Sequence, residues 1–343
     1  MSKRKLTRQQ KWRQTKVQQE RIERASKKSD EKDGAVKDVE LIGPESQGRV
    51  IANFGAKLLV EDDQREIVRC HSRTNLGQIV VGDYVIFQHV ANSDDSVVVA
   101  LCERRTCLER TLYHGEVKQV AANIDQILIF ATPVPALQPV LIDRYLIATE
   151  LAGIDAVVVF NKVDLVNEEN QEEFHEVVDL YRDLGYHTLL YSNKVELGLQ
   201  QLEDILANKT SILVGQSGVG KSSTIKRLLP DRDIIIGDLN EKGTLGKHTT
   251  SASRLYHLPH GGEIIDSPGV RDFGLWHVDK DKIISGYPEL RDLPEQCQFR
   301  NCSHRHEPGC ALTDAAQTGK ISWLRLRNFW TIMDAVNDAA RED

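Results

Sequence analysis

"SILVGQSGVGKSSTIKRLLP", residues 211–230, decides the fold, because it places a complete G-x-x-x-x-G-K-[ST] motif between an apolar run and a helical pattern. Gly215 and Gly220 allow successive backbone amides to turn inward around phosphate groups. Lys221 would neutralise phosphate charge, and Ser222 would ligate magnesium. A glycine-rich surface turn is the simpler alternative, but it requires neither the strand nor the helix. The predicted phosphate-binding residues are Gly215, Gln216, Ser217, Gly218, Val219, Gly220, Lys221, Ser222 and Ser223.

Strand-like and helical patterns alternate in the segment that precedes this motif. The apolar runs "NIDQILIFATP" (123–133), "DAVVVF" (155–160) and "HTLLYS" (187–192) are typical of buried strands. The helical patterns "PVLIDRYLIATELAG" (139–153) and "NQEEFHEVVDLYRDLG" (170–185) separate them. This alternation predicts a parallel, doubly wound α/β sheet, which binds ligands beyond the carboxyl ends of its strands.

"NKVD", residues 161–164, follows one of these strands and has the composition of a base-reading motif. The carboxylate of Asp164 can accept hydrogen bonds from both N1 and N2 of guanine, which adenine cannot donate. Asn161 would brace the neighbouring loop, and the stem of Lys162 would cover the base. Two alternatives stay open, namely a surface turn and an ATPase in which Asp164 has no role. The predicted base-binding residues are Asn161, Lys162, Val163 and Asp164.

A third motif is "EIIDSPG", residues 263–269, in which a strand leads into a D-x-x-G pattern. Asp266 would hold magnesium through water, and the amide of Gly269 would contact the terminal phosphate. The stretch "GTLGKHTTS" just upstream lies where a magnesium-sensing loop is expected, with Thr249 or Thr250 as the sensing residue.

Short alternating stretches fill residues 37–112, and turn signals such as "NFG", "EDDQ" and "NSDD" separate them. They include "GRVIANFGAKLLVED" (48–62), "VVGDYVIFQHV" (80–90) and "SVVVALCERRTCLER" (96–110). Five short strands in this length predict a small antiparallel barrel, for which an OB-fold is the first choice. An SH3-like barrel, or a barrel that only packs against its neighbour, remains an alternative.

Charge divides the N-terminal segment from the rest of the chain. Residues 1–32 hold twelve Lys and Arg against four Asp and Glu, although the 343-residue chain has a net charge of −7. The segment has few apolar residues, so we expect it to be disordered when free. Its basic character favours an arm that binds nucleic acid over a tail that only improves solubility.

"CQFRNCSHRHEPGC", residues 297–310, gathers cysteine and histidine. Cys297, Cys302, His304 and Cys310 predict a tetrahedral zinc site that is structural, because four protein ligands leave no open position. The alternatives are free thiols on a loop and His306 as the histidine ligand.

An amphipathic helix is expected after this cluster, in "KISWLRLRNFWTIMDAVNDAAR" (320–341). Its apolar residues are predicted to be buried, and two arginines, Arg325 and Arg327, are expected to face elsewhere and to be available to RNA. The residues expected in the core are Trp323, Leu326, Phe329, Trp330 and Met333.

The order of the motifs is that of a conventional GTPase cut and rejoined, because "NKVD" and "SNK" (192–194) precede the phosphate loop, "HTT" and "DSPG". With a barrel before it, a Cys/His cluster after it and a basic tail, the chain resembles the circularly permuted GTPase family, specifically the bacterial GTPases that depend on the small ribosomal subunit. The resemblance covers nearly all of residues 37–340. "SNK" departs from the more usual Ser-Ala-Lys at Asn193.

This resemblance implies a GTP hydrolase that binds the 30S subunit and 16S rRNA and checks late assembly, with slow intrinsic turnover. It implies GTP or GDP, Mg²⁺ and one structural Zn²⁺ as ligands, no DNA or membrane partner, and a monomer. Val270 stands where Ras-like enzymes place a water-orienting Gln, so the resemblance points to His248 instead. The implied catalytic residues are His248, Lys221 and Thr250. An RNA-binding module in which nucleotide only tunes affinity is the alternative.

Four regions are therefore expected. A cytoplasmic location is also expected, because no apolar run reaches the roughly 20 residues that cross a bilayer. The permutation leads the D-x-x-G segment directly into the last region, so phosphate state would reposition it. The regions are a basic tail (1–36), an OB-type β-barrel (37–112), a circularly permuted P-loop GTPase domain (113–277) and a zinc-binding helical domain (278–343).

Overall fold

The structure, a computed structural model, divides the chain into two compact units. The first contains Met1–Arg105, Ala121–Asn123 and Asp231–Tyr256, and the second contains Thr106–Val120, Ile124–Pro230 and His257–Asp343. The predicted basic tail lies outside the described residues, and the four-region division remains a prediction. The structure describes residues 42–55, 57–72, 76–90, 95–111, 117–134, 136–231, 253–267 and 280–342.

The first unit is built on a closed five-stranded barrel, as the sequence predicted. Its strands pair in the circle β1-β2-β3-β5-β4-β1, in which only the β3–β5 pair is parallel. This topology is that of an OB-type barrel, and its core is aliphatic apart from Phe87 and Cys70. The strands are β1 (Ile42–Asn53), β2 (Lys57–Asp62), β3 (Ile67–Ser72), β4 (Tyr84–Val90) and β5 (Asp95–Leu101).

The run 96–110, which the sequence interpretation assigned to the barrel, contains two separate strands. Only its first part belongs to β5. The second part, β6 (Cys107–Thr111), pairs with β7 (Val117–Ala122) in a two-stranded sheet. The sequence interpretation did not predict this hairpin.

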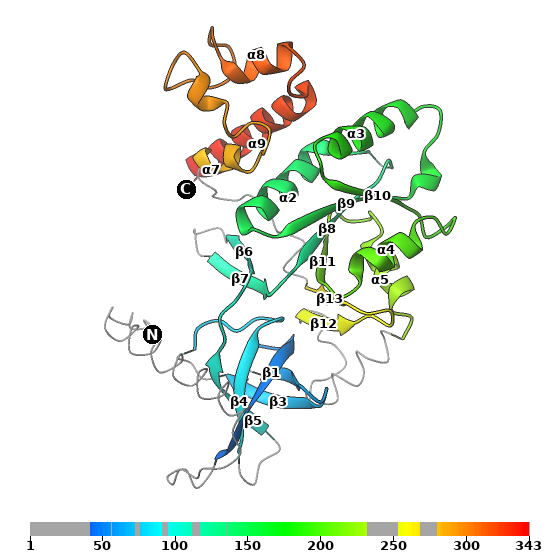
Figure 1. Cartoon of the computed structure of the whole chain (residues 1–343), viewed down its shortest axis with the longest axis vertical. Coiled ribbons are helices and arrows are strands. Elements are labelled where there is room, and N and C mark those ends of the chain that lie inside the picture. Colours follow the sequence, from blue (N-terminus) through cyan, green and yellow to red (C-terminus); the bar gives the residue numbers. More distant parts are fainter. Residues whose placement is uncertain are drawn as a thin grey trace. The chain divides into compact units, whose positions relative to one another are not determined.

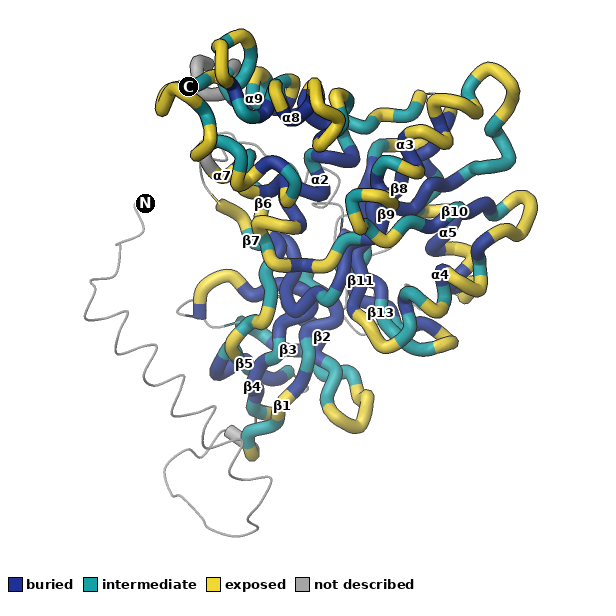
Figure 2. Tube along the Cα trace, turned by 45° about the horizontal axis from the view of Figure 1, so that its top comes forward, coloured by how far each residue is buried: buried dark blue, intermediate teal, exposed yellow. Residues whose placement is uncertain are grey.

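The second unit contains the predicted parallel sheet, with strand order β10-β9-β8-β11-β13. All of its pairings are parallel. Every residue of β8 and β11 is buried, and Figure 2 shows this part of the sheet as the buried centre of the unit. The strands are β8 (Gln126–Ala131), β9 (Asp155–Asn161), β10 (His187–Tyr191), β11 (Thr210–Val214) and β13 (Glu263–Asp266).

Helices cover both faces of this sheet (Figure 1). α2 (Pro139–Ala152) and α3 (Gln171–Asp183) follow β8 and β9 on one face, and α4 (Leu199–Leu206) and α5 (Lys221–Leu228) follow β10 and β11 on the other. The chain therefore leaves β8 and β11 in opposite directions. Ligands of doubly wound sheets bind at such a switch point, and the phosphate loop begins there.

The C-terminal helices pack on the same unit through a buried charged cluster. They are α7 (Lys280–Ser285), α8 (Ala311–Gln317) and α9 (Trp323–Glu342), and α9 contacts α2. The guanidinium of Arg325 is fully buried, and it donates hydrogen bonds to the carboxylates of Asp143 on α2 and Glu289. Asp143 also accepts hydrogen bonds from Tyr181 at 2.5 Å and from Asn328 at 2.7 Å.

Two expectations for α9 were wrong. Arg325 does not face outward, because its charge is compensated inside the molecule by Asp143 and Glu289. Trp323, expected in the core, stands at the first position of the helix and is 42% exposed. Leu326 and Phe329 are buried as predicted, and Arg327 is exposed.

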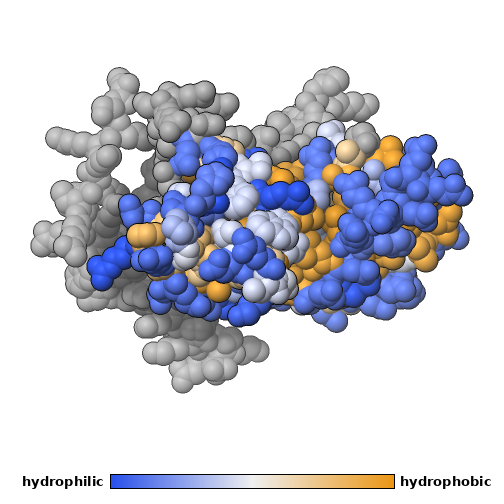
Figure 3. Space-filling model, turned by 90° about the horizontal axis from the view of Figure 1, so that it is seen from above, coloured by the Kyte–Doolittle hydropathy of each residue, from blue (hydrophilic) through white to orange (hydrophobic). Residues whose placement is uncertain are grey.

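Hydrophilic side chains cover most of the described surface seen from above in Figure 3, and apolar side chains gather in a band between them. Within the described ranges, no helix is both long enough and apolar enough to span a membrane.

We predict that Arg325→Met lowers the free energy of unfolding by about 3 to 5 kcal/mol, because it leaves two carboxylates without their buried cation. Thermal unfolding followed by tryptophan fluorescence measures the effect, since Trp323 and Trp330 lie in α9. The matched control is Arg327→Met, which should unfold within about 0.5 kcal/mol of the parent chain because Arg327 is exposed. Equal stability of the two variants would contradict the role of the cluster.

Candidate nucleotide site and metal centre

The phosphate loop occupies the turn between β11 and α5. Gly215, Gly218 and Gly220 have φ angles of 130°, 81° and 100°, which favour glycine. A Cβ at Gly220 would lie 2.2 Å from the side-chain nitrogen of Asn161, so this position also requires glycine for space. Lys221 extends across the loop and donates to the carbonyl oxygens of Gly215, at 2.5 Å, and Gln216, at 2.8 Å. The side chain of Lys221 is therefore folded back over the loop that precedes the first turn of α5, where a phosphate cradle is expected.

The predicted base-reading motif, residues 161–164, lies directly against this loop. Asn161 ends β9 in a buried position, and its side-chain amide donates to the carbonyl of Val219 at 2.7 Å. Lys162 has a positive φ of 59°, and its ammonium donates to the carbonyl of Gly218 at 2.6 Å. Val163 and Asp164 follow in the short 3₁₀ helix η1 (Val163–Leu165). The structure thus brings together two motifs that the sequence separates by about fifty residues.

Asp164 is held from the opposite side by the loop after β10. The hydroxyl of Ser192 donates to one oxygen of Asp164 at 2.5 Å, and the ammonium of Lys194 lies 3.9 Å from the other. The side chain of Asp164 is only 9% exposed, whereas that of Lys194 is 78% exposed. This arrangement orients a nearly buried carboxylate at the end of the sheet where a base would be read.

Asp266 and Ser222 line the same small cavity next to the phosphate loop. Asp266 is the last residue of β13, which pairs with β11, so the sheet places its carboxylate beside the loop. The cavity is lined by Leu213, Val214, Gly215, Lys221, Ser222, Ile225, Asp266 and Ser267. An oxygen pair of this kind suits magnesium, which prefers carboxylate, hydroxyl and water ligands.

Four predicted site residues lie outside the described residues. They are His248, Thr249, Thr250 and Gly269. The sequence interpretation did not select Tyr191 and Thr224, whose hydroxyls lie close to the site. A tyrosine at the end of a strand and a threonine within a helix carry no motif that would have marked them.

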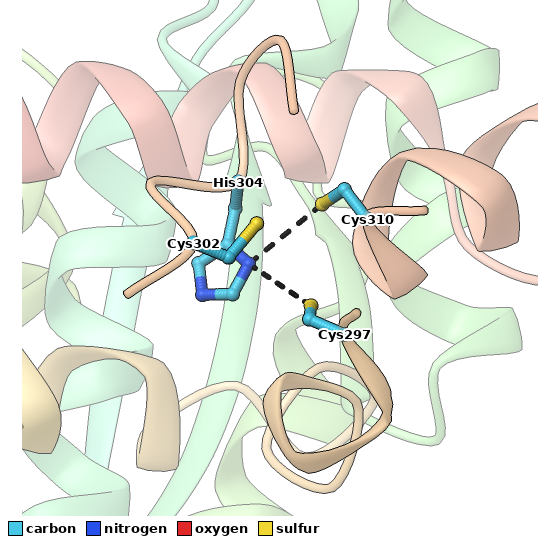
Figure 4. Close-up of side chains that lie close together, drawn as sticks. All are labelled: Cys297, Cys302, His304 and Cys310. Atoms are coloured by element: carbon cyan, nitrogen blue, oxygen red, sulfur yellow. Dashed lines mark hydrogen bonds between the residues drawn. The ribbon is translucent and has the colours of Figure 1, made fainter. Parts of the chain in front are cut away.

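The four predicted metal ligands come together in one cluster (Figure 4). The ligand atoms of Cys297, Cys302, His304 and Cys310 all lie within 4.8 Å of one another. Nδ1 of His304 lies 3.5 Å from the sulfur of Cys297 and 3.7 Å from that of Cys310. Tetrahedral zinc with ordinary bond lengths would place such atoms about 3.6 to 3.8 Å apart. The donor set therefore fits one structural zinc ion, and His306 is exposed and outside the cluster.

Neighbouring residues hold the metal loop in shape. The carboxylate of Glu307 accepts hydrogen bonds from the backbone amides of Ser303, Arg305 and His306 at 2.9 to 3.2 Å. The indole of Trp330 on α9 donates to the carbonyl of His304 at 2.8 Å. Burial lowers the pKa of His304, which favours the neutral imidazole that a metal binds. The loop is thus anchored to the same helix that carries Arg325.

The fold and these motifs define a circularly permuted P-loop GTPase with an OB-type barrel and a C-terminal Cys₃His cluster. The model of the RsgA GTPase family matches residues 101–276. A relative from Alcanivorax borkumensis, "Small ribosomal subunit biogenesis GTPase RsgA", is 47% identical over 100% of this chain and 98% of its own length. A relative of the same name from Hahella chejuensis is 44% identical over 98% of both chains. The chain belongs to the RsgA GTPase family.

Solved structures agree with this assignment. The crystal structure of YjeQ from Thermotoga maritima matches with a TM-score of 0.69 and 26% identity, covering 85% of this chain and 99% of that one. The structure of YloQ, described as a circularly permuted GTPase, matches with a TM-score of 0.66 and 24% identity over 86% and 96% of the two chains. The latter supports the fold. Membership of a GTPase family implies GTP or GDP and Mg²⁺ as ligands.

We predict that Asp164→Asn weakens GTP binding by about 2 to 4 kcal/mol, because an amide cannot accept both hydrogen bonds from the guanine edge. The variant should bind xanthosine triphosphate better than the parent chain does. Equilibrium titrations with both nucleotides measure the exchange. GTP affinity equal to that of the parent would refute base reading by Asp164.

For the metal cluster, we predict one zinc per chain in protein purified without chelator. Cys297→Ala should lose the zinc and unfold the segment around residues 297–310, since the cluster ties that loop together. His306→Ala is the matched control and should keep the metal. Elemental analysis of the three proteins decides, and a parent chain without zinc would overturn the assignment.

Proposed function

We propose that this chain is a GTP hydrolase that acts in late assembly and maturation of the 30S ribosomal subunit. In this proposal the subunit stimulates hydrolysis, and hydrolysis drives release. The observation that carries the proposal is the full-length similarity to proteins named small ribosomal subunit biogenesis GTPases, at 47% and 44% identity. The joined base-reading and phosphate motifs supply the nucleotide dependence that such a cycle needs.

GTP and GDP are the proposed ligands of the site at the carboxyl ends of β9 and β11. Asp164 would select guanine, Asn161 would fix the phosphate loop, and the stem of Lys162 would cover the base. Lys221 would neutralise the outer phosphates, and bound magnesium would supply further positive charge there. Ser222, Asp266 and Thr250 are the residues proposed to hold that ion directly or through water, with Gly269 contacting the terminal phosphate.

His248 is the proposed residue that positions the attacking water. The basis is the resemblance together with Val270, an aliphatic residue that cannot orient water at the position after the D-x-x-G motif. In the proposed cycle the subunit brings this histidine into place, so turnover of the free chain is slow. Lys221 contributes by charge stabilisation of the transferring phosphoryl group.

The proposed contact on the subunit is 16S rRNA rather than DNA. The basic residues 1–32 and the OB-type barrel are the surfaces we assign to it, since a basic arm gains affinity by displacing counterions from phosphates. The Cys₃His cluster is proposed to hold one structural zinc. We further propose that the chain is a monomer and that it acts in the cytoplasm.

The test compares GTP turnover with and without 30S subunits for the parent chain, Lys221→Ala and His248→Ala. Lys221→Ala should lose nucleotide binding or hydrolysis. His248→Ala should bind GTP like the parent and lose on the order of 100-fold of the stimulated rate, because it removes only the positioning of water. Full stimulation in His248→Ala would remove this residue from catalysis. A parent chain that binds 30S subunits without any change in turnover would instead favour an RNA-binding module tuned by nucleotide.

A further inference from the structure

Asn193 lies in the loop after β10, at the position where GTPases more usually have alanine. Its side-chain oxygen accepts a hydrogen bond from the hydroxyl of Tyr191 at 2.5 Å. Burial raises the pKa of Tyr191, so this phenol remains a donor. The side-chain nitrogen of Asn193 points to the hydroxyl of Thr224 at 3.5 Å. Only a side chain with both an acceptor and a donor can make these contacts, and alanine has neither.

Thr224 links this contact to the phosphate loop. It is fully buried one turn inside α5, and its hydroxyl donates to the carbonyl of Gly220 at 3.0 Å. Gly220 is the residue immediately before Lys221, at which α5 begins. The amide of Asn193 therefore reaches the helix whose first turn carries the proposed phosphate and magnesium contacts.

Ser192, the residue just before Asn193 in the chain, holds the carboxylate of Asp164. Ser192 donates to Asp164 at 2.5 Å and accepts from the backbone amide of Lys194 at 3.1 Å. Because Asn193 follows Ser192 directly in the chain, a shift of Asn193 would displace Ser192, which orients Asp164. An ion pair between Glu196 and Arg227, at 2.7 Å, ties the same loop to α5, but both side chains are exposed and contribute little.

The base side and the phosphate side of the site are consequently connected along two routes. In the first, the side chain of Asn161 donates a hydrogen bond to the carbonyl of Val219. The second runs from Asp164 by a hydrogen bond to Ser192, along the chain to the next residue, Asn193, and from its side chain to the hydroxyl of Thr224 on α5. Among its members, Asn193 is the residue that crosses from the loop to the helix.

We propose that Asn193 is a positioning residue that sets guanine selectivity by fixing the loop that holds Asp164 against α5. The proposal rests on the guanine assignment made above. It concerns the side chain of Asn193, which acts on Asp164 through the neighbouring Ser192 and on α5 through Thr224. Its loss should therefore affect recognition of the guanine edge more than general nucleotide binding.

The experiment compares GDP with IDP, whose base lacks the exocyclic amino group that Asp164 reads. Dissociation constants of both are measured for the parent chain, Asn193→Ala and Val195→Ala, by competition with a fluorescent guanine nucleotide, and that of ADP is measured for the parent chain. Asn193→Ala should reduce the preference for GDP over IDP by about three- to tenfold, the value of about one hydrogen bond. Val195→Ala is the control, because that side chain is 56% exposed, and should keep the parent preference.

Tyr191→Phe provides a second, independent arm in case Asn193→Ala does not fold. It removes only the hydroxyl that Asn193 accepts from, and it should lower the GDP preference about two- to threefold. In the Asn193→Ala background the same change should have a smaller effect than in the parent, because the contact with Asn193 is already gone and only the interaction of the hydroxyl with Thr224 is left to lose.

The outcomes separate this inference from the proposed function. If the parent chain binds GDP no better than ADP, the guanine assignment itself fails. If the parent is selective and both Asn193→Ala and Tyr191→Phe keep its GDP-to-IDP ratio, the guanine assignment stands and the positioning role is overturned. Equal weakening of GDP and IDP with a lowered unfolding temperature would also overturn it, since that pattern marks a residue that only supports folding.

Discussion

The hydrogen bond from the side-chain amide of Asn161 to the carbonyl of Val219 is the contact on which the proposed nucleotide site depends. It joins residues 58 positions apart, and it is possible because parallel β9 and β11 end at the same edge of the sheet. Such a site is assembled in space, so the order of its motifs along the chain does not change its chemistry. A chain in which the base-reading motif precedes the phosphate loop in the sequence can therefore build the same pocket.

A second constraint acts at the opposite side of the unit. The strand that carries Asp266 is followed along the chain by the C-terminal helices, and the buried pair of Arg325 with Asp143 ties α9 to α2. These helices are thus connected to the rest of the unit twice, once by the chain that follows β13 and once by the charged cluster on α2. A signal from the terminal phosphate to this region would have to move the cluster as one body or break it at considerable cost.

Periodic and motif-based features were predictable from the sequence. The helices α3, α4 and α5 follow apolar patterns of helical period, and the five barrel strands alternate between clear turn signals. The Cys/His cluster was predictable because the spacing of its ligands is local. Features that depend on distant partners were not: Arg325 pairs with a residue 182 positions away, and nothing in the pattern of α9 marks it as buried. The sequence marked Asn193 only as a departure from the usual alanine. Its role could not be predicted, because its partner Thr224 lies in another element, α5.

The most direct test of this account measures hydrolysis of GTP and ATP by the full chain alone and with 30S, 50S or 70S particles. We expect the chain to hydrolyse GTP only, slowly when it is free and faster with the 30S subunit, well beyond any effect of the 50S subunit. Equal hydrolysis of ATP, or a GTP rate that no ribosomal particle changes, would contradict it.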